Sequence, residues 1–217
     1  MGQILLVRHA QASWGAEDYD VLSERGHQQS VLLGDAFAAR GIVPSRVAHG
    51  TLRRQRETAE LCAQAAGWDV TPLVDGAWDE IDALGIAAVV PIQVPGEPSR
   101  RQFQEWFEQG MTRWSAGFHD AEYAESWPAF SARALAALAW ATGLPGTTVV
   151  FSSGGPIARV VAELLAPEDA AALYHRLNPV CVNTGITRVV TGRRGVTMVS
   201  FNEHAHLDGV PGMLTYR

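Results

Sequence analysis

The stretch Gln-Ile-Leu-Leu-Val-Arg-His-Ala, residues 3–10, decides the fold class. Residues 3–7 form a short apolar run, which predicts a strand buried on both faces, as in parallel sheets that carry helices above and below. Arg8 and His9 follow this run at once. Ligands of open α/β sheets bind at the carboxyl ends of the strands, so the first candidate site lies at this edge of the sheet.

Outward from this strand, short β-branched runs alternate with helical periodicity. Further strands are predicted over residues 46–49, 70–73 and 147–152, and helices over 26–40, 52–66, 126–141 and 157–165. Two extended runs flank Gly192-Arg193-Arg194, which predicts a hairpin near the end of the sequence. This alternation predicts the α/β class: a three-layer α/β/α sandwich with a mostly parallel central sheet.

Residues 82–127 break this rhythm. Three prolines close to one another, Pro91, Pro95 and Pro98, indicate a loop. After the loop, aromatic residues from Phe103 to Phe118 recur at helical spacing, which is more typical of a core face than of a binding face. We therefore predict a single domain over residues 1–217 that carries a helical insertion at about 82–127.

Composition excludes several classes of protein. The chain has 17 basic and 23 acidic residues, a formal charge of −6 that argues against nonspecific nucleic-acid binding. No apolar run approaches the ~20 residues of a membrane span, and no signal peptide is visible. Cys62 and Cys181 lie too far apart in sequence for a disulfide framework and are typical of buried thiols in a reducing compartment. We expect a cytoplasmic protein with no nucleic-acid or membrane partner; its oligomeric state stays open.

The residues at the predicted strand ends define a chemistry. Arg8 and Arg54 carry guanidinium forks that match phosphate oxygens, and the Gly-rich start of the helix after residue 152 adds backbone donors. His9, as a neutral imidazole, could attack phosphorus to form a phosphohistidine that water then opens. Glu80 could protonate the leaving alkoxide and then activate the water. Because the arginines neutralise the developing charge, we expect neither a metal nor another cofactor.

Four segments resemble the histidine phosphatase superfamily, in its phosphoglycerate mutase-like branch. They are residues 5–13 around the Arg-His pair, 22–29, 52–59 with Arg54, and 202–207. The resemblance implies that His9 is the nucleophile, that Arg8 and Arg54 hold the phosphate, and that Glu80 is the proton donor. It also implies a phosphatase that hydrolyses a small phosphomonoester and releases inorganic phosphate.

The sequence departs from that family at two positions. Ser153 stands where the family usually has a second histidine, in Ser152-Ser153-Gly154-Gly155, and Ala12 stands where a threonine is common. Ser153 and Gly154 remain candidate phosphate donors, with Ser13 as a substitute for the threonine. Losing a charged donor to the transferring group predicts turnover that is ~10²–10³ slower.

Other interpretations stay open. The fold could serve a phosphoglycerate mutase-type phosphotransferase, or a protein that binds a phosphorylated ligand with little turnover. A serine hydrolase is disfavoured, because no glycine stands two residues before Ser152 or Ser153. His204 and His206 could face the same way and bind a metal, but a polar chain end that packs near the mouth of the site is the favoured explanation. The substrate is not identified by the sequence.

Overall fold

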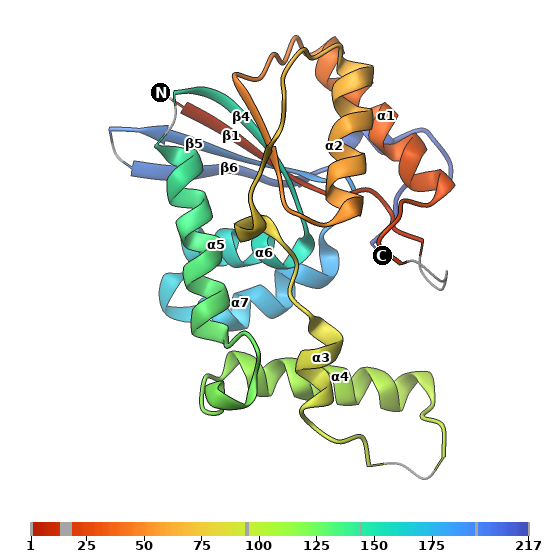
Figure 1. The fold of residues 1–217 in the computed structure, drawn as a ribbon, viewed down its shortest axis with the longest axis vertical. Helices are drawn as coiled ribbons and strands as arrows, with labels where there is room; N and C mark the ends of the chain where they lie inside the picture. Colours follow the sequence, from red (N-terminus) through yellow and green to blue (C-terminus); the bar gives the residue numbers. More distant parts are fainter. Residues whose placement is uncertain (1, 14–18, 94–95, 144, 194, 217) are drawn as a thin grey trace. The chain divides into compact units, whose positions relative to one another are not determined.

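The computed structural model describes residues 2–13, 19–93, 96–143, 145–193 and 195–216 (Figure 1). The chain forms two compact units. One unit comprises Met1–Glu80 with Ala134–Arg217, and the other comprises Ile81–Arg133. The second unit contains the segment in which we expect a helical insertion, at about 82–127. That residues 1–217 form a single domain stays a prediction.

The larger unit is built on a six-stranded sheet with the order β3-β2-β4-β1-β5-β6. The strands are β1 (Gly2–Arg8), β2 (Arg46–His49), β3 (Leu73–Val74), β4 (Gly146–Ser152), β5 (Ile186–Gly192) and β6 (Gly195–Glu203). The pairs β3-β2, β2-β4 and β4-β1 are parallel, whereas β5 and β6 are antiparallel to their neighbours. The mostly parallel sheet and the terminal hairpin are thus confirmed. The strand expected over 70–73 is wrong except for Leu73, where pairing with β2 begins.

Helices cover both faces of this sheet, which confirms the three-layer α/β/α class (Figure 1). Helices α1 (Glu24–Ala39) and α2 (Arg53–Ala66) cover one face. Helix α6 (Gly154–Leu165) and the end of α5 (Trp127–Thr142) cover the other, and α7 (Ala170–Leu177) packs on α6.

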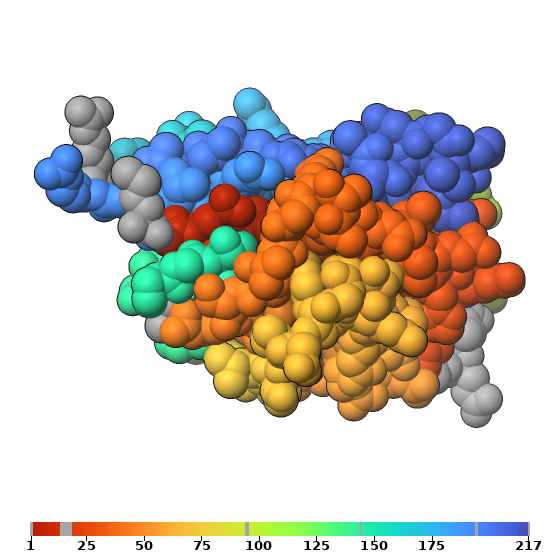
Figure 2. All heavy atoms as spheres, turned by 90° about the horizontal axis from the view of Figure 1, so that it is seen from above, coloured from red at the N-terminus to blue at the C-terminus, as the bar shows by residue number. Residues whose placement is uncertain are grey.

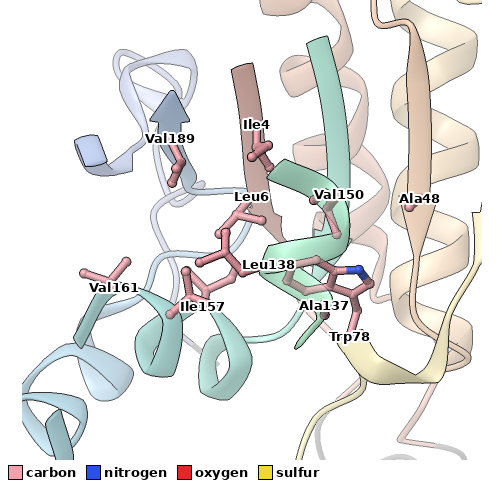
Figure 3. Close-up of a cluster of buried hydrophobic side chains, with 12 residues drawn as sticks. Ile4, Leu6, Ala48, Trp78, Ala137, Leu138, Val150, Ile157, Val161 and Val189 are labelled. Carbon is pink, nitrogen blue, oxygen red and sulfur yellow. The ribbon is translucent and has the colours of Figure 1, made fainter. Parts of the chain in front are cut away.

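The two faces of β1 enter two hydrophobic clusters. Leu5 and Val7 pack toward α1 and α2, and Ile4 and Leu6 pack toward α6, together with Trp78 (Figure 3). All four β1 side chains are essentially inaccessible to solvent. Each contributes about 1.5–3 kcal/mol through burial of apolar surface. A strand anchored on both faces holds its last residue, Arg8, and the following His9 in a fixed place.

Helix α6 begins at Gly154, three residues earlier than the sequence predicts. Gly154-Gly155-Pro156 is therefore its first turn and not a separate loop. A proline is tolerated in a first helical turn, because that position has no intrahelical acceptor for an N–H. Ser153 becomes the N-cap residue directly after β4, so the strand passes into the helix without an intervening loop.

The second unit consists of α3 (Ala83–Ala88), α4 (Arg100–Ser115), the 3₁₀ turn η2 (Asp120–Glu122) and the start of α5. On α4, Trp114 is buried against Trp127 and Phe130, with ring centroids 5.1 and 5.4 Å apart. The expectation that Phe118 is a core residue is wrong. Helix α4 ends at Ser115, Gly117 turns the chain with φ +72°, and Phe118 is 87% exposed.

No helix in the described parts of the chain has both the length and the apolar character needed to cross a bilayer.

Candidate active site

His9 lies directly after β1, beside β4. Its backbone N–H donates to the carbonyl of Ser152 over 2.8 Å, which continues the β1–β4 ladder by one residue. The ring is buried, and Nδ1 lies 2.7 Å from the carbonyl oxygen of Ala10. A carbonyl oxygen only accepts hydrogen bonds, so Nδ1 carries the proton and Nε2 keeps a lone pair. The atom available for nucleophilic attack is therefore Nε2.

Arg54, in the first turn of α2, contacts His9 Nε2. Its Nε–H donates to His9 Nε2 over 3.2 Å, and its Nη1 lies 2.6 Å from a carboxylate oxygen of Asp20. Asp20 also accepts the backbone N–H of Arg53 over 2.8 Å. It thereby caps α2, whose N-cap residue Leu52 makes no side-chain capping bond. The guanidinium group is fixed between the imidazole and a carboxylate.

Arg8 is held by neutral groups instead. Its Nη1 donates to the carbonyls of Cys181 and Tyr216, the latter over 2.8 Å. Its Nε is buried and has no hydrogen-bond partner among the residues that the structure describes. Burial lowers the pKa of Arg8, although Glu80 acts in the opposite direction through its negative charge. A buried donor without a partner costs about 1–3 kcal/mol, which a bound anion would recover.

These surroundings set the charge of the His9 imidazole. Burial first, and then the positive charges of Arg8 and Arg54, hold the pKa of His9 well below its usual range. The imidazole is therefore neutral near pH 7, the state in which a histidine can attack phosphorus.

Glu80 reaches the start of α6. Its Oε2 accepts the backbone N–H of Gly155 over 3.2 Å. A Cβ atom at Gly155 would stand 2.2 Å from Glu80 Oε1, so this approach requires glycine. Beside it, a Cβ at Gly154 would stand 3.6 Å from Arg8 Nε. The two glycines thus bring Glu80 and Arg8 to one helix terminus.

The two carboxylates that compete with Glu80 in the sequence serve other positions. Asp79 accepts the backbone N–H and the hydroxyl of Thr51, at 2.5 and 2.6 Å. Asp82 caps α3 by accepting the N–H of Gly85 over 2.9 Å. Glu80, by contrast, is bonded to the start of α6.

Ser153 is fully buried at the end of β4, and its Oγ accepts a hydrogen bond from Gln55 Nε2 over 2.9 Å. No histidine contacts it as a base, so nothing supports the serine hydrolase alternative within the described residues. Ser13 is less closely tied to the site. Its backbone N–H bonds Val21 over 2.9 Å, and its side chain bonds none of the described site residues. Phosphate binding by Ser13 stays a prediction.

Several supporting residues carry no sequence signal. Asn183 donates to the carbonyl of His9 over 3.0 Å, and Thr215 in turn donates to Asn183 over 2.8 Å. The C-terminal residues lie beside α1, where Gln29 donates to the carbonyl of Met213 over 2.7 Å (Figure 2). Amides and hydroxyls of this kind are common in any chain, so only the fold reveals that they hold the backbone of His9.

The two late histidines have separate partners. His204 Nδ1 lies 2.7 Å from the carbonyl of Asn202, and His206 Nε2 lies 2.9 Å from Thr184 Oγ1. Burial lowers the pKa of His206 to about 4. Across the described ranges, no group of three or more His, Cys, Asp and Glu side chains is placed to hold a metal.

A mostly parallel α/β sheet that carries a neutral imidazole and two buried arginines at one edge is suited to binding an anion such as phosphate. The family model of the histidine phosphatase superfamily (branch 1) matches residues 4–204. The chain therefore belongs to that superfamily.

Individual relatives agree with this assignment. A probable phosphoglycerate mutase of Citrobacter koseri is 36% identical over 77 residues, 33% of this chain and 35% of that protein. The match thus spans about a third of the curated relative. A phosphoserine phosphatase from Entamoeba histolytica shares the fold with a TM-score of 0.68 and 21% identity, over 95% of this chain and all of that one. The mycobacterial glucosyl-3-phosphoglycerate phosphatase aligns with a TM-score of 0.61 and 20% identity, over 94% and 99%.

Proposed function

We propose that this protein is a metal-independent phosphatase that hydrolyses a small phosphomonoester through a phosphohistidine at His9. The observation that carries the proposal is the state of the imidazole. Nδ1–H is bonded to a backbone carbonyl, Nε2 is the free base, and a lowered pKa keeps the ring neutral. Family membership and the phosphatases among the structural relatives support the same reaction.

In the first step, His9 Nε2 attacks phosphorus, an Nε2–P bond forms, and the P–O bond to the alcohol breaks. Arg8 and Arg54 bind the phosphoryl oxygens, on which charge is spread in the transition state. The phosphate must take over contacts that Asp20 and the Tyr216 carbonyl make in this structure. Arg54 Nε–H, which donates to His9 Nε2 here, must turn to a phosphoryl oxygen so that the lone pair of Nε2 can attack. Glu80 gives its proton to the departing alkoxide.

In the second step, water attacks phosphorus and the N–P bond breaks. Glu80 takes the proton of the water, and inorganic phosphate leaves. Ser153 Oγ and the Gly154 N–H act as further donors to the phosphoryl group. Both cysteines are free thiols, which supports the cytoplasm as the compartment.

The test is trapping of the covalent intermediate. After mixing with a phosphomonoester and rapid quenching, we expect an acid-labile adduct with the mass of one phosphoryl group on the wild type, and none on His9→Ala. His9→Ala should also lose phosphate release while keeping a cooperative thermal transition. Residual turnover above a few per cent would remove His9 from the nucleophile role. Transfer of the phosphoryl group to a second alcohol, with little release to water, would favour a mutase.

A further inference from the structure

The side-chain amide of Gln55 joins two groups at the buried side of the site. Its Nε2 donates to the backbone carbonyl of Trp78 over 3.0 Å and to Ser153 Oγ over 2.9 Å. Gln55 and Ser153 are both fully buried. Gln55 directly follows Arg54 on α2, so one helical turn carries both the arginine that contacts His9 and this amide.

The orientation of the amide is fixed by its surroundings. A backbone carbonyl can only accept, so the nitrogen of Gln55 must face Trp78, and the same nitrogen then faces Ser153. Ser153 Oγ is therefore an acceptor in this bond, and its own proton is directed elsewhere. Among the described residues, no group accepts that proton, and Ser153 does not use its side chain to cap α6. Within the described part of the chain, the Ser153 hydroxyl is thus a buried donor without an acceptor.

Its position relative to the nucleophile follows from the sheet register. Arg8 pairs with Ser152, and His9 donates its backbone N–H to Ser152, so Ser153 stands level with His9 on the neighbouring strand. His49, on the other side of β4, pairs with Phe151 and so lies two residues further back. Ser153, the residue directly after β4, is therefore the one that stands level with His9.

Space filling alone does not explain a glutamine here. Its Oε1 is buried without a partner among the described residues, against Gly50, where an added Cβ would stand 2.1 Å away. An apolar side chain of the same size would fill the space without an unpaired oxygen. A buried polar atom left unsatisfied needs a compensating use of its group. The use visible here is the N–H bond that orients Ser153.

We propose that Gln55 is a positioning residue: it holds the Ser153 hydroxyl so that its proton points at the phosphoryl group being transferred to His9. This inference rests on the proposed function and assigns to Gln55 the role of orienting the Ser153 hydroxyl, a neutral donor. The charge that builds on the phosphoryl oxygens in the transition state strengthens the hydrogen bond from Ser153. Gln55 therefore acts on turnover more than on ground-state binding.

A double-mutant cycle tests this coupling. Gln55→Met keeps the size of the side chain and removes the donor; we expect kcat to fall about tenfold with KM changed less than about threefold. In a Ser153→Ala background, the same change should alter kcat by less than about twofold, because no hydroxyl remains to be aimed. Gln64→Met, an exposed position on the same helix, is the matched control and should keep wild-type kinetics.

A second variant separates aiming from packing. Gln55→Glu has nearly the same shape, but its carboxylate would accept the Ser153 proton and turn it away from the phosphoryl group. Its kcat should fall further than that of Gln55→Met. Wild-type kcat in Gln55→Met, or an equal loss with and without the Ser153 hydroxyl, would overturn the inference.

Vanadate binding keeps the test independent of the proposed function, because vanadate resembles the transition state of phosphoryl transfer. Gln55→Met should weaken vanadate binding about tenfold in the wild-type background and leave it nearly unchanged in Ser153→Ala. If the wild type releases no phosphate and forms no phosphohistidine, the proposed function is wrong. The vanadate cycle alone then decides whether Gln55 aims the Ser153 hydroxyl, and vanadate affinity that ignores Gln55 would overturn the inference.

Discussion

Two sets of residues in the site differ in charge. The first, the cationic rim, consists of Arg8, His9 and Arg54, and the second, the neutral rim, consists of Gln55, Ser153, Gly154 and Gly155. Burial and then the charges of the two arginines lower the pKa of His9, and Arg8 Nε is buried with no hydrogen-bond partner among the described residues. The neutral rim contributes hydroxyl and backbone donors at the start of α6. Charged groups act on anion affinity and on the protonation of the His9 imidazole, whereas neutral donors act through the direction of their hydrogen bonds.

This contrast predicts that substitutions on the two rims fail in different ways. Changes in the cationic rim should weaken phosphate binding and change the response to pH. Changes in the neutral rim should lower turnover with little effect on binding. The strongest variants should therefore lie on the cationic rim.

The largest effect is expected for Arg8→Met. Among the described residues, Arg8 Nε has no hydrogen-bond partner, and Nη1 is held by neutral carbonyls. The positive charge of Arg8 is therefore available to a bound anion. We expect kcat/KM to fall by ~10³ or more, about 4 kcal/mol of transition-state stabilisation. Inorganic phosphate, which should raise the wild-type Tm, should no longer do so. A phosphate-dependent Tm shift that persists in Arg8→Met would place the anion elsewhere.

The next largest effect is expected at Arg54, for which α2 provides two matched controls. Arg54→Ala should weaken phosphate binding by about 1.5–3 kcal/mol, the range for a charged hydrogen bond. Arg53 and Arg56 are half exposed and pair with glutamates one turn along the helix. Arg53→Ala and Arg56→Ala should change binding far less, as measured by calorimetric titration. Equal losses at all three positions would mean a diffuse basic surface and no cationic rim.

Much of the cationic rim could be predicted from sequence, because its residues follow patterns that act over short distances. The apolar run before Arg8 is buried on both faces as expected, and Arg54 lies in the first turn after a predicted strand. Rules for strand ends in α/β sheets then place these residues at one edge.

The neutral rim was harder to predict. Gln55 and Ser153 are 98 positions apart, and neither a glutamine nor a serine is unusual enough in sequence to indicate a partner. The sequence predicts that the helix begins only at Ile157, because glycine and proline disfavour helix interiors, but both are tolerated in the first turn, where α6 has them. The prediction that Phe118 is a core residue was wrong for a related reason, because the helical spacing of the aromatic residues continues beyond Ser115, where α4 ends.

A smaller effect is expected when a side chain that can carry charge is placed in the neutral rim, and this test sharpens the contrast between the two rims. Ser153→His alone should not raise turnover, because Gln55 occupies the space against Ser153 Oγ. Gln55→Ala with Ser153→His makes room for the imidazole, and a positively charged donor should raise kcat roughly tenfold over Gln55→Ala alone. Steady-state kinetics on an aryl phosphate measure both variants. A higher kcat in Ser153→His alone would show that Gln55 moves aside easily. An unchanged kcat in the double variant would show that a positive charge in the neutral rim does not speed phosphoryl transfer.

The smallest effect concerns the stability that the cationic rim costs at low pH. The pKa of His9 is lowered in the folded state, so below about pH 6.5 the unfolded chain binds a proton that the folded chain does not. Stability therefore falls as pH falls, with a slope of about 1.4 kcal/mol per pH unit for each such histidine. His206, whose folded pKa is about 4, contributes in the same direction from pH 6.5 down to that value.

His9→Asn and His206→Asn should each make the unfolding free energy depend less steeply on pH between pH 6 and pH 5, by up to the slope that one proton contributes, as measured by urea titration. Arg8→Met should do so in part, because it removes one of the two positive charges that lower the pKa of His9 while leaving His206 unchanged. A wild-type slope in His9→Asn would mean that the folded protein takes up that proton, and the cationic rim would then hold a charged imidazole that could not attack phosphorus.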